Sequence, residues 1–281
     1  MRWKGREGSR NVGDRRGRRS SGVVAGTGGL GLLAIIAIGF FLGIDVSPFV
    51  SDVGQSDQSA GELSEADREA GEFVSVVLAD TETIWSAVFE EQLGRSYTPT
   101  TLVLYSGVTQ SACGGASGAT GPFYCPVDKN VYLDTDFFVT LSQRLGAGGD
   151  FAAAYVVAHE VAHHVQDELG ILSQATAVRA QVSEADSNAI SVRIELQADC
   201  YSGIWARYAD DRFGALEAGD VAEAMNAAKQ IGDDILQRNA GRVPMPHTFT
   251  HGTSAQRQRW FAMGYQTGDL AVCDTFGTDR L

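Results

Sequence analysis

The chain has 281 residues, of which 44% are hydrophobic and 20% are charged, and this is the composition of a chain that folds. A wholly disordered protein, a collagen-like fibre and a disulfide-dense miniprotein are excluded. The formal net charge of -13 is unevenly divided, because residues 1–22 hold eight basic and two acidic side chains, a balance of +6, which leaves -19 for the rest. An acidic main body argues against a nucleic-acid partner, for which a basic stripe is expected.

The first 44 residues predict a membrane anchor. No ionisable residue occurs from Val23 to Ile44, and a helix of this length spans roughly 33 Å, enough to cross a bilayer core. The positive-inside rule then makes residues 1–22 a basic cytoplasmic tail and residues 23–44 a single transmembrane helix. We expect a single-pass protein of the cell membrane with its main domain outside the cytoplasm. A buried soluble helix and a twin-arginine export signal in residues 15–19 are the alternatives.

The rest of the chain divides into a linker and one domain. Residues 45–63 are rich in Ser and Gly and predict a polar linker, followed by a domain over residues 64–281. Ser64 predicts the N-cap of a helix that continues to about Leu93, and residues 101–105 and 130–133 predict short strands. Residues beyond Asp136 follow a mostly helical pattern. The expected fold class is α+β, mainly helical with a small β-sheet.

Four cysteines agree with a location outside the cytoplasm. Cys113, Cys125, Cys200 and Cys273 allow three pairings, which the sequence does not distinguish. Cys113 and Cys125 flank a glycine-rich, turn-prone stretch, which favours them as a local disulfide in an oxidising compartment. A zinc site built on cysteines is the rival interpretation, but no Cys-x-x-Cys spacing supports it.

The chemistry is concentrated in a helix predicted between Asp150, as its N-cap, and Gly170, as its stop. This helix contains His159-Glu160-Val161-Ala162-His163, the H-E-x-x-H arrangement. A step of four residues stacks both imidazoles on one helix face, so that their nitrogens can converge on one metal ion. Glu160 is then placed to contact a metal-bound water.

A catalytic zinc needs a third protein ligand and an open fourth position. The downstream candidates are Glu195, Asp199, His247 and His251. Glu195 and Asp199 are four residues apart in a second helical pattern, so Glu195 can bind the metal while Asp199 accepts the free N–H of a ligand histidine. The reverse assignment of these two residues is a weaker arrangement, and a solvated acidic helix face is the alternative without a metal.

Several stretches together resemble the bacterial putative neutral zinc metallopeptidase family. They are Gly121-Pro122-Phe123-Tyr124-Cys125-Pro126, the stretch from His159 to Gln166, Glu195-Leu196-Gln197-Ala198-Asp199-Cys200 and Thr250-His251-Gly252-Thr253. Glu-x-x-x-Asp after H-E-x-x-H is also similar to the gluzincin pattern, although the 31-residue gap is longer than usual. The resemblance implies a zincin-like domain with one Zn²⁺ on His159, His163 and Glu195, and with Glu160 as general base.

The predicted activity is zinc-dependent hydrolysis of peptide bonds in extracytoplasmic proteins or peptides. Glu160 takes a proton from the zinc-activated water and delivers it to the leaving amine. His251 is a candidate donor to the oxyanion, with a structural loop histidine as the alternative. The rival function is a non-catalytic, membrane-tethered interaction domain with a structural or degenerate zinc site. The sequence indicates neither the substrate nor the oligomeric state.

The remaining features are given structural interpretations. Gly232-Asp233-Asp234 contains a carboxylate pair that is interpreted as a solvated helix face rather than a cation site. The basic residues in Gln256-Arg257-Gln258-Arg259-Trp260 are interpreted as partners of an acidic surface. His164 is expected to be exposed or to cap a neighbouring group, and His247 to lie in a loop.

Overall fold

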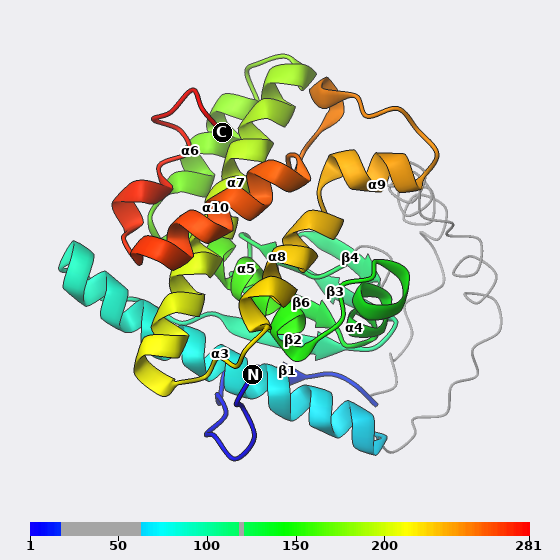
Figure 1. The fold of residues 1–281 in the computed structure, drawn as a ribbon, viewed down its shortest axis with the longest axis vertical. Coiled ribbons are helices and arrows are strands. Elements are labelled where there is room, and N and C mark those ends of the chain that lie inside the picture. Colours follow the sequence, from blue (N-terminus) through cyan, green and yellow to red (C-terminus); the bar gives the residue numbers. More distant parts are fainter. Residues whose placement is uncertain (18–62, 118–120) are drawn as a thin grey trace.

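The computed structural model describes residues 1–17, 63–117 and 121–281 (Figure 1). The predicted transmembrane helix 23–44 and nearly all of the predicted linker 45–63 lie outside these ranges. None of the helices within them combines the length and the apolar character that a bilayer crossing requires. The described residues form the mainly helical α+β fold that the sequence predicts.

A four-stranded sheet has the order β1-β2-β6-β5. Strands β1 (Val12–Asp14), β2 (Thr101–Tyr105) and β6 (Asn130–Asp134) are parallel, and β5 (Phe123–Cys125) runs antiparallel at the edge. A separate hairpin joins β3 (Val108–Ser111) and β4 (Gly114–Ser117). The two predicted strands are therefore present, and the other four described strands are additions that their short lengths concealed.

Helices make up most of the domain, and Ser64 caps the first of those described with a hydrogen bond from the backbone N–H of Asp67, as predicted. A π-helical turn at Phe89–Leu93 prolongs it, and short 3₁₀ turns occur at Pro246–Thr248 and Leu270–Cys273. The described α-helices are α3 (Glu65–Val88), α4 (Asp136–Val139), α5 (Asp150–Glu168), α6 (Ile171–Arg179), α7 (Glu184–Phe213), α8 (Asp220–Gln230), α9 (Asp233–Asn239) and α10 (Ser254–Thr267).

Helix α5 lies in the middle of the molecule, between the sheet and helix α7 (Figure 1). Fifteen of its 19 residues are buried, many of them alanines that let neighbouring elements approach closely. The helix begins after Gly149, so Asp150 is its first residue rather than the predicted N-cap. Its end agrees with the prediction, because Gly170 adopts a left-handed conformation with φ of 78°. A buried central helix gives its polar residues a fixed position.

Helices α7 and α10 approach each other through two glycines. A Cβ atom on Gly203 would stand 2.1 Å from the carbonyl oxygen of Phe261, and one on Gly264 would stand 1.9 Å from the carbonyl oxygen of Cys200. Only glycine permits this contact, because any side chain would push the two backbones apart. The close crossing holds α10 against the half of α7 that follows Glu195 and Asp199.

The N-terminal residues belong to the domain. Strand β1 pairs with β2, with Val12 opposite Leu102 and Asp14 opposite Leu104. Met1 and Trp3 are each only 7% exposed and belong to the main hydrophobic core. Residues 1–17 therefore pack with the domain instead of forming a separate tail.

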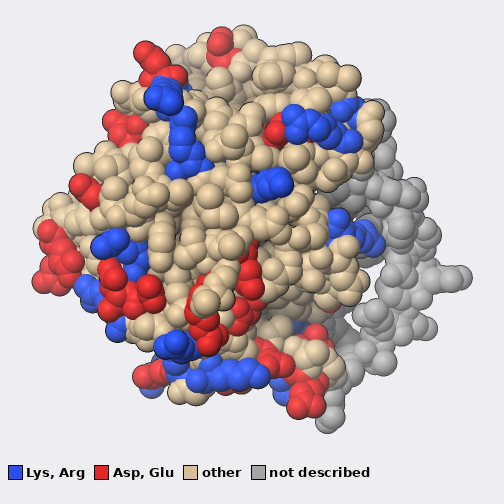
Figure 2. Space-filling view, in the orientation of Figure 1, with Lys and Arg blue, Asp and Glu red and all other residues tan. Residues whose placement is uncertain are grey.

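The basic side chains of this segment explain why the prediction went wrong. Arg6 forms a two-pronged ion pair with the buried carboxylate of Asp80, and Nζ of Lys4 lies 2.6 Å from a carboxylate oxygen of Glu69. Figure 2 shows basic and acidic groups side by side along the edge where Figure 1 places the N-terminus and α3. Basic residues that pair with an acidic domain and basic residues that orient a membrane anchor give the same residue count. Composition alone could therefore not distinguish the two interpretations.

All four cysteines are paired. Cys113 forms the predicted local disulfide with Cys125, and Cys200 pairs with Cys273 across 73 positions of sequence. The second bridge joins α7 to the 3₁₀ turn Leu270–Cys273, and both of its cysteines are fully buried. No free cysteine is available for a zinc site among the described residues.

Candidate metal centre

Helix α5 presents two histidines to helix α7. His159 and His163 are four residues apart and therefore share one helix face, with their ring centroids 4.9 Å apart. Both side chains are largely buried, with 7% and 13% of their surface exposed. The H-E-x-x-H motif thus lies on a helix with the geometry that its spacing predicts.

Helix α7 brings Glu195 up to both imidazoles. Its Oε2 atom lies 3.1 Å from Nε2 of His159, and its Oε1 atom lies 3.5 Å from Nε2 of His163. One ligand atom from each of the three residues falls within 4.8 Å of the other two. Two imidazole nitrogens and one carboxylate oxygen match the ligand set of a catalytic zinc, so these residues fit the metal.

The long gap between His163 and Glu195 has a structural explanation. The chain leaves α5 at Glu168, passes through α6 and re-enters the core in α7, which begins at Glu184. Helix α7 contacts both α5 and α6, so the inserted segment packs alongside the site. The insertion changes the spacing in sequence and preserves the pairing of two helices in space.

Asp199 lies on the far side of His159 from Glu195. Its Oδ1 atom is 3.0 Å from Nδ1 of His159, and its carboxylate is fully buried. Arg257 binds the same carboxylate with two hydrogen bonds, from Nε at 2.8 Å and from Nη2 at 2.9 Å, and the hydroxyl of Tyr155 donates a third. Asp199 therefore lies against the Nδ1 side of His159, and its charge is compensated by Arg257.

The pKa values at the site follow from these contacts. Burial lowers the pKa of His159, but Asp199 and Glu195 outweigh burial and raise it to about 9. Burial raises the pKa of Glu195, but His163 and His159 outweigh it and hold the pKa well below its usual range. Asp199 behaves in the same way, because Arg257 and His159 overcome its burial and lower its pKa. Both carboxylates are therefore anionic at neutral pH.

Glu160 follows His159 on α5 and is only 8% exposed. Burial raises the pKa of Glu160, and the nearby imidazoles of His163 and His159 only partly offset that rise. A raised pKa makes a carboxylate a better proton acceptor. The position and environment of Glu160 match those expected of a general base.

His251 is held beside the site by a carboxylate that the sequence interpretation had placed on a solvated face. Asp233 is 6% exposed and accepts hydrogen bonds from the backbone N–H groups of Thr250, His251 and Gly252 at 2.7 to 3.0 Å. Its other oxygen lies 3.3 Å from Nδ1 of His251. Burial lowers the pKa of His251, but Asp233 and Glu195 raise it overall. The solvated-face interpretation of Asp233 is therefore wrong.

Arg257 is a buried residue beside the site that the sequence interpretation missed. It was assigned to the acidic surface, whereas its side chain is 2% exposed and contacts Asp199. A signal was present, because Arg257 shares the helical spacing of the other buried residues of α10, which are Ser254, Trp260, Phe261 and Gly264. A cation on an apolar helix stripe indicates a buried anion opposite to it.

The two remaining histidines differ from each other. His164 is buried rather than exposed; its Nε2 donates to the carbonyl oxygen of Thr98 at 2.7 Å, and its Nδ1 lies 3.1 Å from the hydroxyl of Tyr124. His247 is exposed in the turn Pro246–Thr248, as predicted, and its carbonyl oxygen accepts a hydrogen bond from Asn188. Neither imidazole belongs to the metal cluster.

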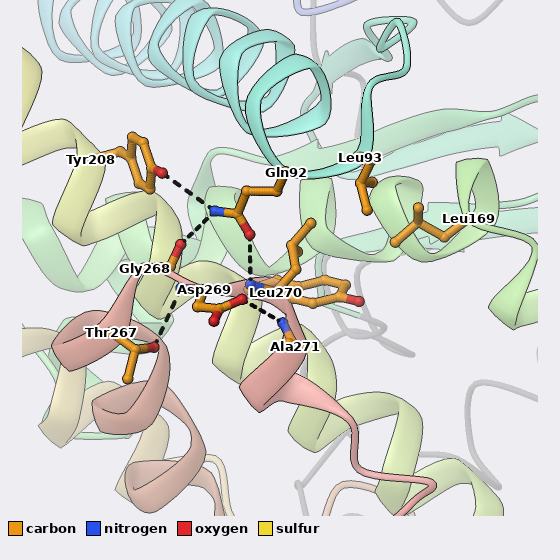
Figure 3. A pocket seen from close by; sticks show the side chains of 10 residues that line it. Gln92, Leu93, Leu169, Tyr208, Thr267, Gly268, Asp269, Leu270 and Ala271 are labelled. Atoms are coloured by element: carbon orange, nitrogen blue, oxygen red, sulfur yellow. Dashed lines mark hydrogen bonds between the residues drawn. The ribbon is translucent and has the colours of Figure 1, made fainter.

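A cavity of about 630 Å³ lies near the end of α3, and its lining includes none of the predicted site residues (Figure 3). Gln92 occupies its centre, where its amide donates to the hydroxyl of Tyr208 and to the carbonyl oxygen of Gly268 and accepts from the N–H of Leu270. These hydrogen bonds satisfy the amide without a ligand.

The site combines two histidines on α5 with a glutamate from α7, and a second glutamate lies buried beside the first histidine. This arrangement matches the H-E-x-x-H class of metal centres with a glutamate as third ligand. The chain belongs to the family described as putative neutral zinc metallopeptidase, whose model matches residues 1–276. The resemblance noted in the sequence is thereby confirmed, and the family implies zinc as the metal.

Two relatives extend this comparison. The chain is 45% identical over 289 residues to the "Uncharacterized protein YpfJ" of Escherichia coli strain K12, with 99% of each chain covered. It is 44% identical over 223 residues to the "Uncharacterized protein Rv2575" of Mycobacterium tuberculosis strain H37Rv, covering 76% of this chain and 74% of the relative. No solved structure matches the chain.

Proposed function

We propose that the chain is a zinc-dependent endopeptidase that hydrolyses peptide bonds in proteins or peptides. The observation that carries this proposal is the convergence of His159, His163 and Glu195 on one point, with Glu160 buried beside them. A structural zinc site is closed by four protein ligands and has no use for a base. The three-ligand cluster with an adjacent glutamate therefore favours catalysis over the alternative, a non-catalytic interaction domain.

Each residue of the site has a separate function in the proposed peptide hydrolysis. His159, His163 and Glu195 would hold one Zn²⁺, which when bound polarises the scissile carbonyl and acidifies water. Glu160 accepts a proton from the attacking water and passes it to the leaving amine. His251 donates to the developing oxyanion, with Asp233 holding its imidazole in place. Asp199 keeps His159 oriented, and Arg257 keeps Asp199 ionised.

We infer that the domain works outside the cytoplasm, because stable disulfides belong to oxidising compartments and both pairs of cysteines are joined. Attachment to the cell membrane through residues 23–44 stays a prediction. We further infer that both ends of the intervening segment lie on the same side of any membrane, because strand β1 in residues 1–17 pairs with β2 of the main domain. The proposed location therefore differs from the sequence prediction in the side on which the N-terminus lies.

The test is casein hydrolysis by the purified chain loaded with zinc, with and without a chelator. Glu160→Gln is expected to bind zinc and to lose turnover by about 10² to 10⁴-fold, because the general base is removed. Glu168→Gln is the matched control, since Glu168 lies at the end of the same helix and pairs with Lys129 at 3.0 Å. Undiminished turnover in Glu160→Gln would overturn the proposal, and bound zinc without turnover in the native chain would favour the interaction domain.

A further inference from the structure

The second histidine of the cluster has an amide partner instead of a carboxylate. Nδ1 of His163 lies 2.9 Å from Oε1 of Gln166, which is three residues further along α5. Gln166 is fully buried, so this hydrogen bond is made away from water. His159 and His163 are therefore supported in chemically different ways, the first by Asp199 and the second by Gln166.

The amide group of Gln166 is hydrogen-bonded to a second glutamine, Gln197. Its Nε2 donates to the carbonyl oxygen of Ile194 at 2.8 Å and to Oε1 of Gln197 at 3.0 Å. Nε2 of Gln197 in turn donates to the carbonyl oxygen of Cys273 at 3.0 Å. The chain of contacts thus runs from His163 through two buried amides to the backbone beside the Cys200–Cys273 disulfide.

The two backbone carbonyls fix the direction of every hydrogen bond in this chain. A carbonyl oxygen only accepts, so the NH₂ groups of Gln166 and Gln197 must face Ile194 and Cys273 respectively. Their Oε1 atoms must then face the other way and accept. The oxygen of Gln166 can only accept from His163, so Nδ1 of that ring carries a proton, and in the neutral imidazole its Nε2 keeps the lone pair that faces Glu195.

We propose that Gln166 is a positioning residue that fixes the tautomer and ring orientation of His163 for metal binding. The hydrogen-bonded chain from His163 through Gln166 and Gln197 to Cys273 is called the amide relay, and Gln197 and Cys273 set the direction of its hydrogen bonds. The inference rests on the proposed zinc function and deepens it. A neutral amide suits this position, because Glu160, Glu195 and Asp199 already bring three carboxylates to the buried centre. The relay orients the ligand without adding a fourth negative charge.

Two substitutions at Gln166 separate this function from simple packing. Gln166→Met preserves the size of the side chain and removes the acceptor, whereas Gln166→Glu preserves an acceptor for His163 and places an oxygen against Ile194 and Gln197. A packing residue would tolerate methionine better than a buried glutamate. The relay predicts the opposite order for zinc affinity, because only glutamate can still accept from Nδ1.

The experiment is a competition titration of zinc against a chelator, using the full purified chain. Gln166→Met is expected to weaken zinc binding by about 10- to 100-fold, and Gln166→Glu to stay within a few-fold of the native affinity despite lower stability. Gln92→Met is the matched control, since Gln92 is also a hydrogen-bonded amide but lies in the cavity of Figure 3. A folded Gln166→Met that binds zinc as tightly as the native chain would overturn the relay.

A second measurement keeps the relay testable if Gln166→Met fails to fold. In protein labelled with ¹⁵N-histidine, the native chain should show a slowly exchanging proton on Nδ1 of His163, which Gln197→Met should expose to faster exchange. A proton on Nε2 with a bare Nδ1 would overturn the relay. Native protein that shows the Nδ1 proton but binds no zinc would refute the proposed function and leave the relay intact.

Discussion

The metal centre and the N-terminal segment differ in how well the sequence predicts their structure. At the metal centre, His159, His163 and Glu195 converge as their residue types and spacing predict. In residues 1–17, an abundance of basic side chains predicted a tail apart from the domain, whereas the structure places a strand of this segment at the edge of its sheet. Metal ligation requires particular donors at particular helical positions, while positive charge serves many purposes.

The two regions are also in physical contact. The N-terminal amine of Met1 lies 2.6 Å from the carboxylate of Asp150, the first residue of α5, and Asp220 lies within 3.4 Å of the same amine. The helix that carries the metal ligands therefore begins where the N-terminal segment is anchored. The stability of one region is expected to depend on the other.

The largest effect on stability is expected at the metal centre. Arg257→Met removes the cation that faces Asp199 and leaves a buried carboxylate without its guanidinium partner, which costs about 3 to 5 kcal/mol in the free energy of unfolding. Urea unfolding at neutral pH measures this loss. Arg238→Met should cost less than about 1 kcal/mol, because the pair of Arg238 with Asp234 is exposed on its basic side. Equal losses in the two variants would contradict the buried contact.

The N-terminal segment is expected to contribute almost as much. Trp3→Ala empties a core position in contact with Phe73 and should cost about 3 kcal/mol in the free energy of unfolding. Lys4→Ala, which alters the adjacent exposed side chain, should leave the free energy of unfolding nearly unchanged. If Trp3→Ala unfolds at the native urea concentration, the segment does not pack in the core.

A smaller effect, confined to catalysis, is expected at His251. Its raised pKa keeps the imidazole protonated to a higher pH than an ordinary histidine, so activity that needs this donor is present below that pKa and lost above it. His251→Phe should lower kcat by about 10²-fold and abolish this alkaline limb of the pH profile, with zinc content unchanged. An alkaline limb that persists in the variant belongs to another group.

The smallest perturbation tests the placement of the N-terminus. A Cβ at Gly8 would lie 3.1 Å from the Cβ of Ser75, within a few tenths of an ångström of disulfide geometry. In intact cells, Gly8→Cys with Ser75→Cys should therefore cross-link with little effect on activity, as a mobility shift without reductant. Gly8→Cys with Ser86→Cys, further along α3, should not. Absence of the first cross-link would place the two segments apart.

How much the sequence reveals depends on how local the determining interaction is. The His159–His163 spacing, the Ser64 cap and the Gly170 stop are set within a few residues, and all three agree with the structure. Strand β1 has three residues and exists only because β2 lies beside it. The partnership of Arg257 with Asp199 spans 58 positions and depends on the crossing of α7 and α10, which no local pattern encodes.

The central claim is that His159, His163 and Glu195 hold one zinc ion. X-ray absorption at the zinc edge of the purified, zinc-loaded chain tests it most directly. The expected spectrum shows nitrogen and oxygen ligands at about 2.0 to 2.2 Å with an imidazole contribution, and His163→Ala should lose both the ion and the spectrum. A shell of sulfur ligands near about 2.3 Å, or stoichiometric zinc in His163→Ala, would contradict the assignment.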